Sequence, residues 1–208
     1  MPNRDAQPLV TRKSPTRKLS PFWRYSSYLQ DSMPARRTLA TLAADQLRAG
    51  IAVIERIEDA AWTASPAPIA ASPVGAHFRH VFDHVDALLS GVADGIVDYD
   101  ARARDVRIER DRSYALMFAR RLEARLRALG DRDGDGAVRV LQDCGERGSR
   151  AATCSTWARE LQFVVAHTTH HHAMIALLLR AAGMQVEASF GLAPSTLRHL
   201  ESQSACAH

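Results

Sequence analysis

The sequence predicts an all-α protein, an up-and-down four-helix bundle with a short β-hairpin between the third and fourth helices. Apolar residues recur at helical spacing in four long segments, and the segments between them are short and rich in glycine, proline or polar residues. Apolar residues make up 46% and charged residues 24% of the 208 residues, which is the balance of a globular protein with one sizeable core.

The first 35 residues are unlike the rest of the chain. Prolines interrupt them at positions 8, 15, 21 and 34, and residues 1–32 hold six basic against two acidic side chains. The formal net charge of +4 therefore belongs to this segment, and the remainder, with 21 basic and 21 acidic side chains, is neutral. We expect residues 1–35 to be a disordered basic tail, or an extension from a start assigned upstream of Met33, with a mitochondrial-type address as the functional alternative. Residues 36–208 are expected to form a single helical bundle domain.

Each predicted helix follows from the spacing of its apolar residues and from the residues at its ends. Gly130 and Gly183 follow the third and fourth helices, as C-terminal caps do, and Ser155 or Thr156 is placed to cap the fourth helix at its start. The turn-rich residues 145–149 predict the hairpin. The four long helices are expected over residues 38–61, 75–92, 106–129 and from residue 155 or 156 to about 182, and a short fifth helix near residues 194–198.

The fourth helix is apolar on nearly every side and is expected to be the most buried element. Four histidines interrupt it, and its uninterrupted apolar part is far shorter than the roughly 20 residues that cross a bilayer. No apolar run follows the basic N-terminus, as a secretory signal requires, and the three cysteines are an odd and sparse set. These observations predict a cytoplasmic protein that contacts no membrane, and the neutral body predicts no nucleic-acid partner.

Seven of the nine histidines lie in two short segments, one in the second predicted helix and one in the fourth. His80 and His84 are four residues apart, and so are His167 and His171, so that each pair lies on one face of its helix. This spacing offers two imidazoles to a single metal ion. A single histidine on such a face is more often a core residue. Burying several without partners costs roughly a few kcal/mol each, however, and a shared divalent ion removes most of that cost, so the pattern predicts a metal site.

Two motifs resemble the DinB-like (DinB/YfiT) superfamily: GAHFRHVFDH, which runs from Gly75 to His84, and RELQFVVAHTTHH, which runs from Arg159 to His171. Residues 98–105 and 190–198 resemble one uncharacterised branch of that superfamily, and the resemblance covers about residues 38–198. It implies a four-helix bundle that holds one divalent metal through three histidines. One histidine comes from the second helix and two, four residues apart, come from the fourth.

By this resemblance the metal ligands are His80, His167 and His171, and the alternative on the second helix is His84 in place of His80. Three ligands leave a coordination position open, as catalytic sites do. His84 is then expected to be a fourth ligand, a partner of a ligand, or a proton shuttle. Imidazole ligands suit zinc, nickel, iron or manganese alike.

Glu160 is a further candidate for chemistry, because it lies about two turns before His167 on the same helical face. It is expected to act as a general base or to orient a ligand, and the alternative is a carboxylate that stabilises the start of its helix through the macrodipole. The polar segment from Asp98 to Arg104 follows the second helix. It is either a loop that contacts substrate or a structural cluster of ion pairs, and its composition favours the second interpretation.

Two functions remain open. Characterised relatives include thiol-dependent S-transferases and isomerases, so the resemblance implies a metal-dependent transferase, isomerase or hydrolase that acts on a small-molecule substrate. A low-molecular-weight thiol would be its co-substrate, and His84 or Glu160 would handle protons. The alternative is a non-catalytic metal-binding or stress-response bundle whose ion is structural, with His84 completing a closed shell. The family also implies a homodimer.

Overall fold

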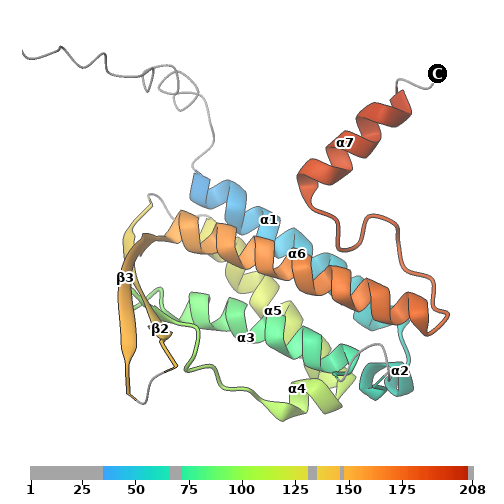
Figure 1. The fold of residues 1–208 in the computed structure, drawn as a ribbon, viewed down its shortest axis with the longest axis horizontal. Helices are drawn as coiled ribbons and strands as arrows, with labels where there is room; N and C mark the ends of the chain where they lie inside the picture. The colour runs from blue at the N-terminus through green and yellow to red at the C-terminus, as the bar shows by residue number, and fades with distance from the viewer. Residues whose placement is uncertain (1–34, 66–71, 131–134, 146–147, 206–208) are drawn as a thin grey trace, which may run out of the picture. The chain divides into compact units, whose positions relative to one another are not determined.

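The computed structural model describes residues 35–65, 72–130, 135–145 and 148–205, and it is mostly helical (Figure 1). Apart from Ala35, the predicted tail over residues 1–35 lies outside the described residues. The long helices are α1 (Ala35–Arg56), α3 (Val74–Ser90), α5 (Arg112–Gly130) and α6 (Trp157–Ala181). The shorter helices are α2 (Asp59–Thr63), α4 (Val106–Arg110) and α7 (Pro194–Ala205). No helix among the described residues is long and apolar enough to cross a membrane.

Side-chain caps mark the starts of α5 and α6. The predicted first helix is divided at Ile57 into α1 and α2, and the predicted third helix is divided at Asp111 into α4 and α5. Asp111 has an extended backbone, and its carboxylate accepts a hydrogen bond from the backbone N–H of Tyr114, so it caps a new helix. Thr156 caps α6 by accepting from the N–H of Arg159, which confirms one of the two predicted caps.

A small three-stranded mixed sheet joins the helices. The predicted hairpin is present as β2 (Ala137–Asp143) and β3 (Arg150–Thr156), which pair antiparallel. The third strand, β1 (Ile96–Asp98), was not predicted. It pairs parallel to β2, with Ile96 opposite Arg139, and lies at the edge of the sheet in the order β1–β2–β3.

The order of the helices differs from a simple up-and-down bundle, in which each helix packs against the next one in sequence. Here α1 packs against α5 and α6, and α3 packs against the same two helices, so that α1 and α3 are diagonal neighbours. Helices α3 and α5 both end close to the sheet, whereas α6 starts from it (Figure 1). Arg112, at the start of α5, donates to the carbonyl of Ile54 near the end of α1, so α1 also runs away from the sheet. The linkers that contain α2 and the hairpin are long enough to make these diagonal connections.

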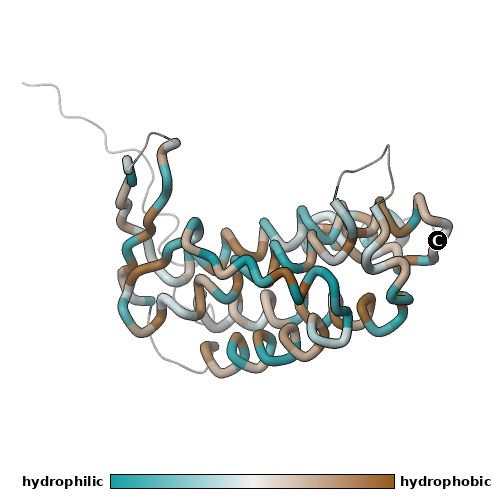
Figure 2. The backbone as a smooth tube through the Cα atoms, turned by 90° about the horizontal axis from the view of Figure 1, so that it is seen from below, coloured by the Kyte–Doolittle hydropathy of each residue, from teal (hydrophilic) through white to brown (hydrophobic). Residues whose placement is uncertain are grey.

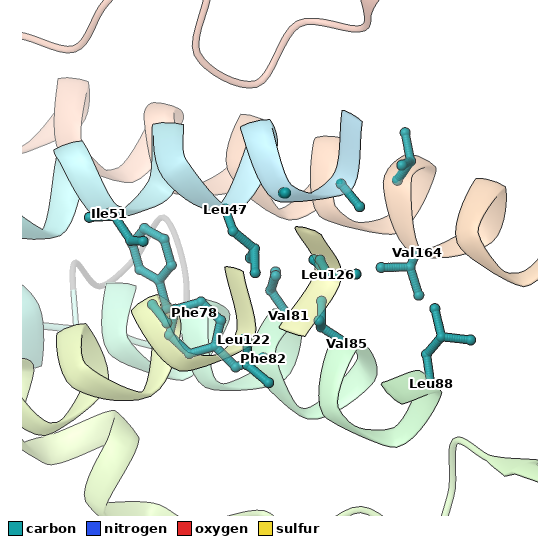
Figure 3. Packing of buried hydrophobic residues seen from close by; sticks show 14 of the residues in the cluster. Leu47, Ile51, Phe78, Val81, Phe82, Val85, Leu88, Leu122, Leu126 and Val164 are labelled. Atoms are coloured by element: carbon teal, nitrogen blue, oxygen red, sulfur yellow. The ribbon is translucent and has the colours of Figure 1, made fainter. Parts of the chain in front are cut away.

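The core fills the space between the four long helices, and Phe78 of α3 is fully buried in it. Its ring stacks on Trp62 with 5.3 Å between centroids and contacts Phe82 at 5.8 Å. Polar and apolar residues are interspersed along each helix (Figure 2), and buried apolar residues of the four long helices form this core. The core side chains come from α1, α3, α5 and α6 and include Leu47, Ile51, Val81, Val85, Leu122 and Val164 (Figure 3).

Candidate metal centre

Four imidazoles meet where α3 packs against α6. His80 and His84 come from α3, and His167 and His171 come from α6, and each pair is separated by one helical turn. The ring centroids of His84 and His167 are 4.1 Å apart, and those of His80 and His84 are 4.4 Å apart. The two predicted pairs therefore face each other across the helix interface, as the spacing of the sequence indicates.

Three of these histidines form a group that could hold a metal ion. In His80, His84 and His167, one nitrogen of each ring lies within 4.8 Å of the corresponding nitrogens of the other two. His84 is buried, whereas His80 and His167 are half-buried. The group contains two of the three predicted ligands, His80 and His167, and its third member is His84, the alternative ligand on the same helix as His80.

His171, the remaining predicted ligand, lies directly beside this group. Its ring centroid is 4.6 Å from that of His80 and 4.6 Å from that of His167, and the centroids of His80 and His167 are 4.9 Å apart. Its Nδ1 is 3.2 Å from Nδ1 of His77, a residue to which the sequence analysis gave no role. The set His80, His167 and His171 stays a prediction, which rests on the spacing in the sequence and on the resemblance.

Both ring nitrogens of His84 have partners. Its Nδ1 is 2.8 Å from the carbonyl oxygen of His80, so Nδ1 carries the proton and donates it. Its Nε2 is then the acceptor, and Nη1 of Arg102 donates to it at 2.9 Å. A hydrogen bond from one ring nitrogen to a backbone carbonyl fixes the tautomer and orientation of an imidazole. The other nitrogen then keeps its lone pair to bind a metal ion or a proton.

The chemistry of the cluster fits a divalent transition metal. Nε2 of His167 and Nε2 of His77 are buried and have no hydrogen-bond partner, and a metal ion is one group that satisfies such nitrogens. Burial first, and then the neighbouring imidazoles, lower the pKa of His80 and of His167 to about 3 and that of His171 to about 4. The rings are therefore neutral at neutral pH and offer lone pairs to a cation without first losing a proton.

Glu160 is buried at the start of α6, and it does not hydrogen-bond to the histidines. Ser155 donates to its Oε1 at 2.6 Å, and the hydroxyl of Tyr99 donates to its Oε2 at 2.9 Å. The ring of Tyr99 in turn stacks on His84, with centroids 5.6 Å apart. Glu160 is thus connected to the histidine cluster through Tyr99, a residue that the sequence placed only in a polar loop.

A hollow of about 400 Å³ opens next to the cluster, between the start of α6 and the sheet. Glu160, Tyr99 and Arg159 line it together with Phe163, whose ring stacks on His167 at 5.6 Å. Residues of β2 and β3 form the other wall. The hollow offers a small molecule both apolar and charged surface beside the histidines.

The polar segment from Asp98 to Arg104 includes a structural ion-pair cluster, the interpretation that its composition favoured. Asp98 pairs with Arg150 and accepts from the N–H groups of Asp100 and Ala101, and Asp100 accepts from the N–H of Asp143 on β2. These contacts tie the segment to the sheet. Arg102 is the exception, since its side chain reaches the histidine cluster instead.

His172 faces away from the cluster, and its burial predicts a pH-dependent stability. The ring is 3% exposed and stacks on Phe190 with centroids 4.4 Å apart, and burial lowers its pKa to about 3. Because the unfolded chain binds this proton near pH 6.5 and the folded chain does not, stability from this residue is complete above pH 6.5 and declines as the pH falls toward 3. Between pH 7 and pH 5 the loss for one such group is about 2 kcal/mol.

This loss is measured by urea unfolding of the chelator-treated protein at pH 7 and pH 5. His172→Leu, which removes the titrating ring and keeps an apolar side chain, is expected to lose less stability over this interval than the wild type. Equal losses in the two proteins would show that His172 takes up its proton in the folded state.

The sequence of this chain matches the model of a known protein family. A sequence model of the DinB family matches residues 51–193, which is more than half of the chain. The chain is also similar to the FK506-binding protein 5 of Rhizopus delemar, with 43% identity over 49 residues. That match covers 24% of this chain and 13% of the other protein, so the chain spans only a small part of that relative's length. No solved structure matches.

Proposed function

This chain belongs to the DinB family, and from this membership together with its histidine cluster we propose that it is a divalent-metal-dependent enzyme with an open three-histidine site. The proposed activity is that of a thiol-dependent transferase or isomerase, or of a hydrolase, acting on a small-molecule substrate. The observation that carries the proposal is the convergence of neutral imidazoles from α3 and α6 at one point of the bundle.

The proposed ligands are His80, His167 and His171. Their ring centroids lie 4.6, 4.6 and 4.9 Å apart, so the three imidazoles are direct neighbours. His84 is less suited to be a ligand because Arg102 occupies its acceptor nitrogen. A fourth coordination position then stays open to substrate, and the ion is zinc, nickel, iron or manganese.

The bound ion would supply Lewis acidity that makes a thiol or a water molecule more acidic. His84 holds its own proton on Nδ1, against the carbonyl of His80, so it would accept a proton from the reacting group at Nε2 in place of the hydrogen bond from Arg102. Tyr99 holds the ring of His84 from one side, and Glu160 fixes the Tyr99 hydroxyl. Glu160 would therefore contribute by positioning Tyr99 and His84 as well as by its charge.

The hollow beside Phe163 is the proposed place for the low-molecular-weight thiol. Its lining residue Phe163 stacks on His167, and the hollow is also lined by the buried carboxylate of Glu160 and the exposed side chain of Arg159. A small peptide-like thiol carries ammonium and carboxylate groups, and this wall offers a partner of opposite charge to each.

Metal loading is expected to stabilise the protein. Zinc added to chelator-treated protein at about 100 times its dissociation constant should raise the unfolding free energy by about 2.7 kcal/mol. Thermal melts followed by circular dichroism, repeated with nickel, iron and manganese, measure this shift beside elemental analysis of the untagged protein. A chain that takes up none of the four ions would overturn the proposal.

The non-catalytic alternative, a structural ion in a closed shell, predicts a different result. His84 would then be a fourth ligand, so His84→Ala would lower the affinity for zinc, whereas in the proposed open site it leaves zinc bound. Assays of thiol transfer and isomerisation on the loaded protein follow. Loss of zinc in His84→Ala together with no thiol-dependent activity would favour the structural role.

A further inference from the structure

Arg102 is an arginine without a carboxylate partner at the edge of the histidine cluster. Among the described residues, none of its nitrogens lies within ion-pair distance of an acidic oxygen. Nη1 donates to Nε2 of His84 at 2.9 Å, whereas Nε is buried and has no hydrogen-bond partner. A guanidinium has five N–H donors, and here one nitrogen is engaged with a protein group.

The nearby carboxylates are all engaged elsewhere. Asp83 and Asp100 are close enough to favour the charge of Arg102, but Asp83 pairs with Arg79 at 3.0 Å and Asp100 accepts from the N–H of Asp143. Burial lowers the pKa of Arg102, which shows that its charged form is disfavoured where it lies. Arg102 therefore lies as a cation beside neutral imidazoles, and no carboxylate of the described residues pairs with it directly.

The backbone holds Arg102 in this position. Asp98 fixes the N–H groups of Asp100 and Ala101 on one side, and Arg104 on the other side has a left-handed backbone with a φ of 50°. Left-handed backbone is unfavourable for a residue with a side chain, so it persists where the surrounding contacts impose it. The side chain is thus presented to the cluster by a loop anchored to the sheet.

The unpaired edge of the Arg102 guanidinium has a geometry that suits a carboxylate. Nη1 is directed at His84, and Nε and Nη2 form the other edge, which is the edge that binds the two oxygens of a carboxylate side by side. One guanidinium balances one negative charge. Resting on the proposed function, we propose that Arg102 binds a carboxylate group of the substrate next to the metal site and thereby restricts the enzyme to carboxylate-bearing substrates.

The test is direct binding of acetate to chelator-treated protein, followed by NMR of arginine Nε–H groups. The Arg102 signal, assigned by its absence from Arg102→Lys, is expected to shift saturably with acetate and to respond more weakly to inorganic phosphate. Arg102→Lys, which keeps the charge and loses the planar pair of donors, should weaken acetate binding, read from neighbouring backbone amides, by about tenfold. Arg104→Lys is the matched control, because Arg104 is exposed in the same loop, and it should bind acetate as the wild type does.

The outcomes separate this inference from the proposed function. An Arg102 signal that does not respond saturably to acetate, or responds more strongly to phosphate, overturns the carboxylate site, and so does unchanged acetate binding in Arg102→Lys. Zinc binding is measured on the same samples, and Arg102→Lys is expected to retain it. Saturable acetate binding in a chain that holds no zinc would support the anion site while overturning the metal-dependent function.

Discussion

Replacing His167 with alanine is expected to lower the affinity for zinc by more than about 100-fold. His167 belongs to both histidine sets that could hold an ion: the group with His80 and His84, and the predicted set with His80 and His171. Its Nε2 is buried without a partner, so no competing hydrogen bond has to be broken before it binds an ion. Competition of chelator-treated protein against a chromophoric zinc chelator measures the change.

His170→Ala is the control for this experiment, because His170 is exposed on the same helix. It should retain wild-type affinity, and both variants should melt as the metal-free wild type does, which shows that the fold is preserved. His167→Gln provides a second variant with a polar side chain of similar size. Stoichiometric zinc bound tightly by both His167 variants would contradict the site.

Replacing Gly75 with alanine is expected to destabilise the protein by about 3 kcal/mol, although alanine is the better helix former. Gly75 lies in the first turn of α3, where this helix meets α2 and α4. A methyl group there would lie 2.6 Å from Nε1 of Trp62 and would also overlap the backbone carbonyl of Glu109. Neither group can move freely, since Trp62 is fully buried in the core and a backbone carbonyl is fixed by its helix.

Equilibrium unfolding in urea measures this loss. Ala166→Gly, at an exposed position of α6, gives the matched value for helix propensity and should cost only about 1 kcal/mol. If Gly75→Ala were as stable as the wild type, the contact between α3 and the Glu109 carbonyl would have to be looser than the structure shows.

The sequence was a good guide to the long helices because their apolar residues repeat at helical spacing. The sequence also predicts Ser155 or Thr156 as the cap of the fourth helix, and Thr156 is the cap because its hydroxyl accepts from a backbone N–H three residues away. Strand β1 was missed because its three residues become a strand only by pairing with β2, more than forty residues later. The predicted up-and-down order was also wrong, because α1 packs against α5 and α6 and lies diagonally from α3. The local spacing of apolar residues carries no information on which helices become neighbours.

At the candidate site, too, the features set by spacing within one helix were predictable, whereas the contacts between distant segments were not. His80, His84, His167 and His171 could be placed on two helical faces from their spacing alone, and the structure brings their rings together. The residues that contact those rings from outside the two helices, such as Arg102 and Tyr99, come from the segment that follows α3. No pattern in the sequence indicates that Arg102, eighteen residues after His84, turns back to that ring.

The diagonal placement of α1 and α3 has a consequence for how the chain acquires its structure. A bundle of consecutive hairpins gains most contacts between segments that are close in sequence, whereas here α1 must wait for α5 and α6. This raises the relative contact order, and slower folding than that of a simple bundle of equal length is expected. During synthesis on the ribosome, the histidines of α3 would emerge before those of α6, so the proposed metal site could form only after α6 has been made.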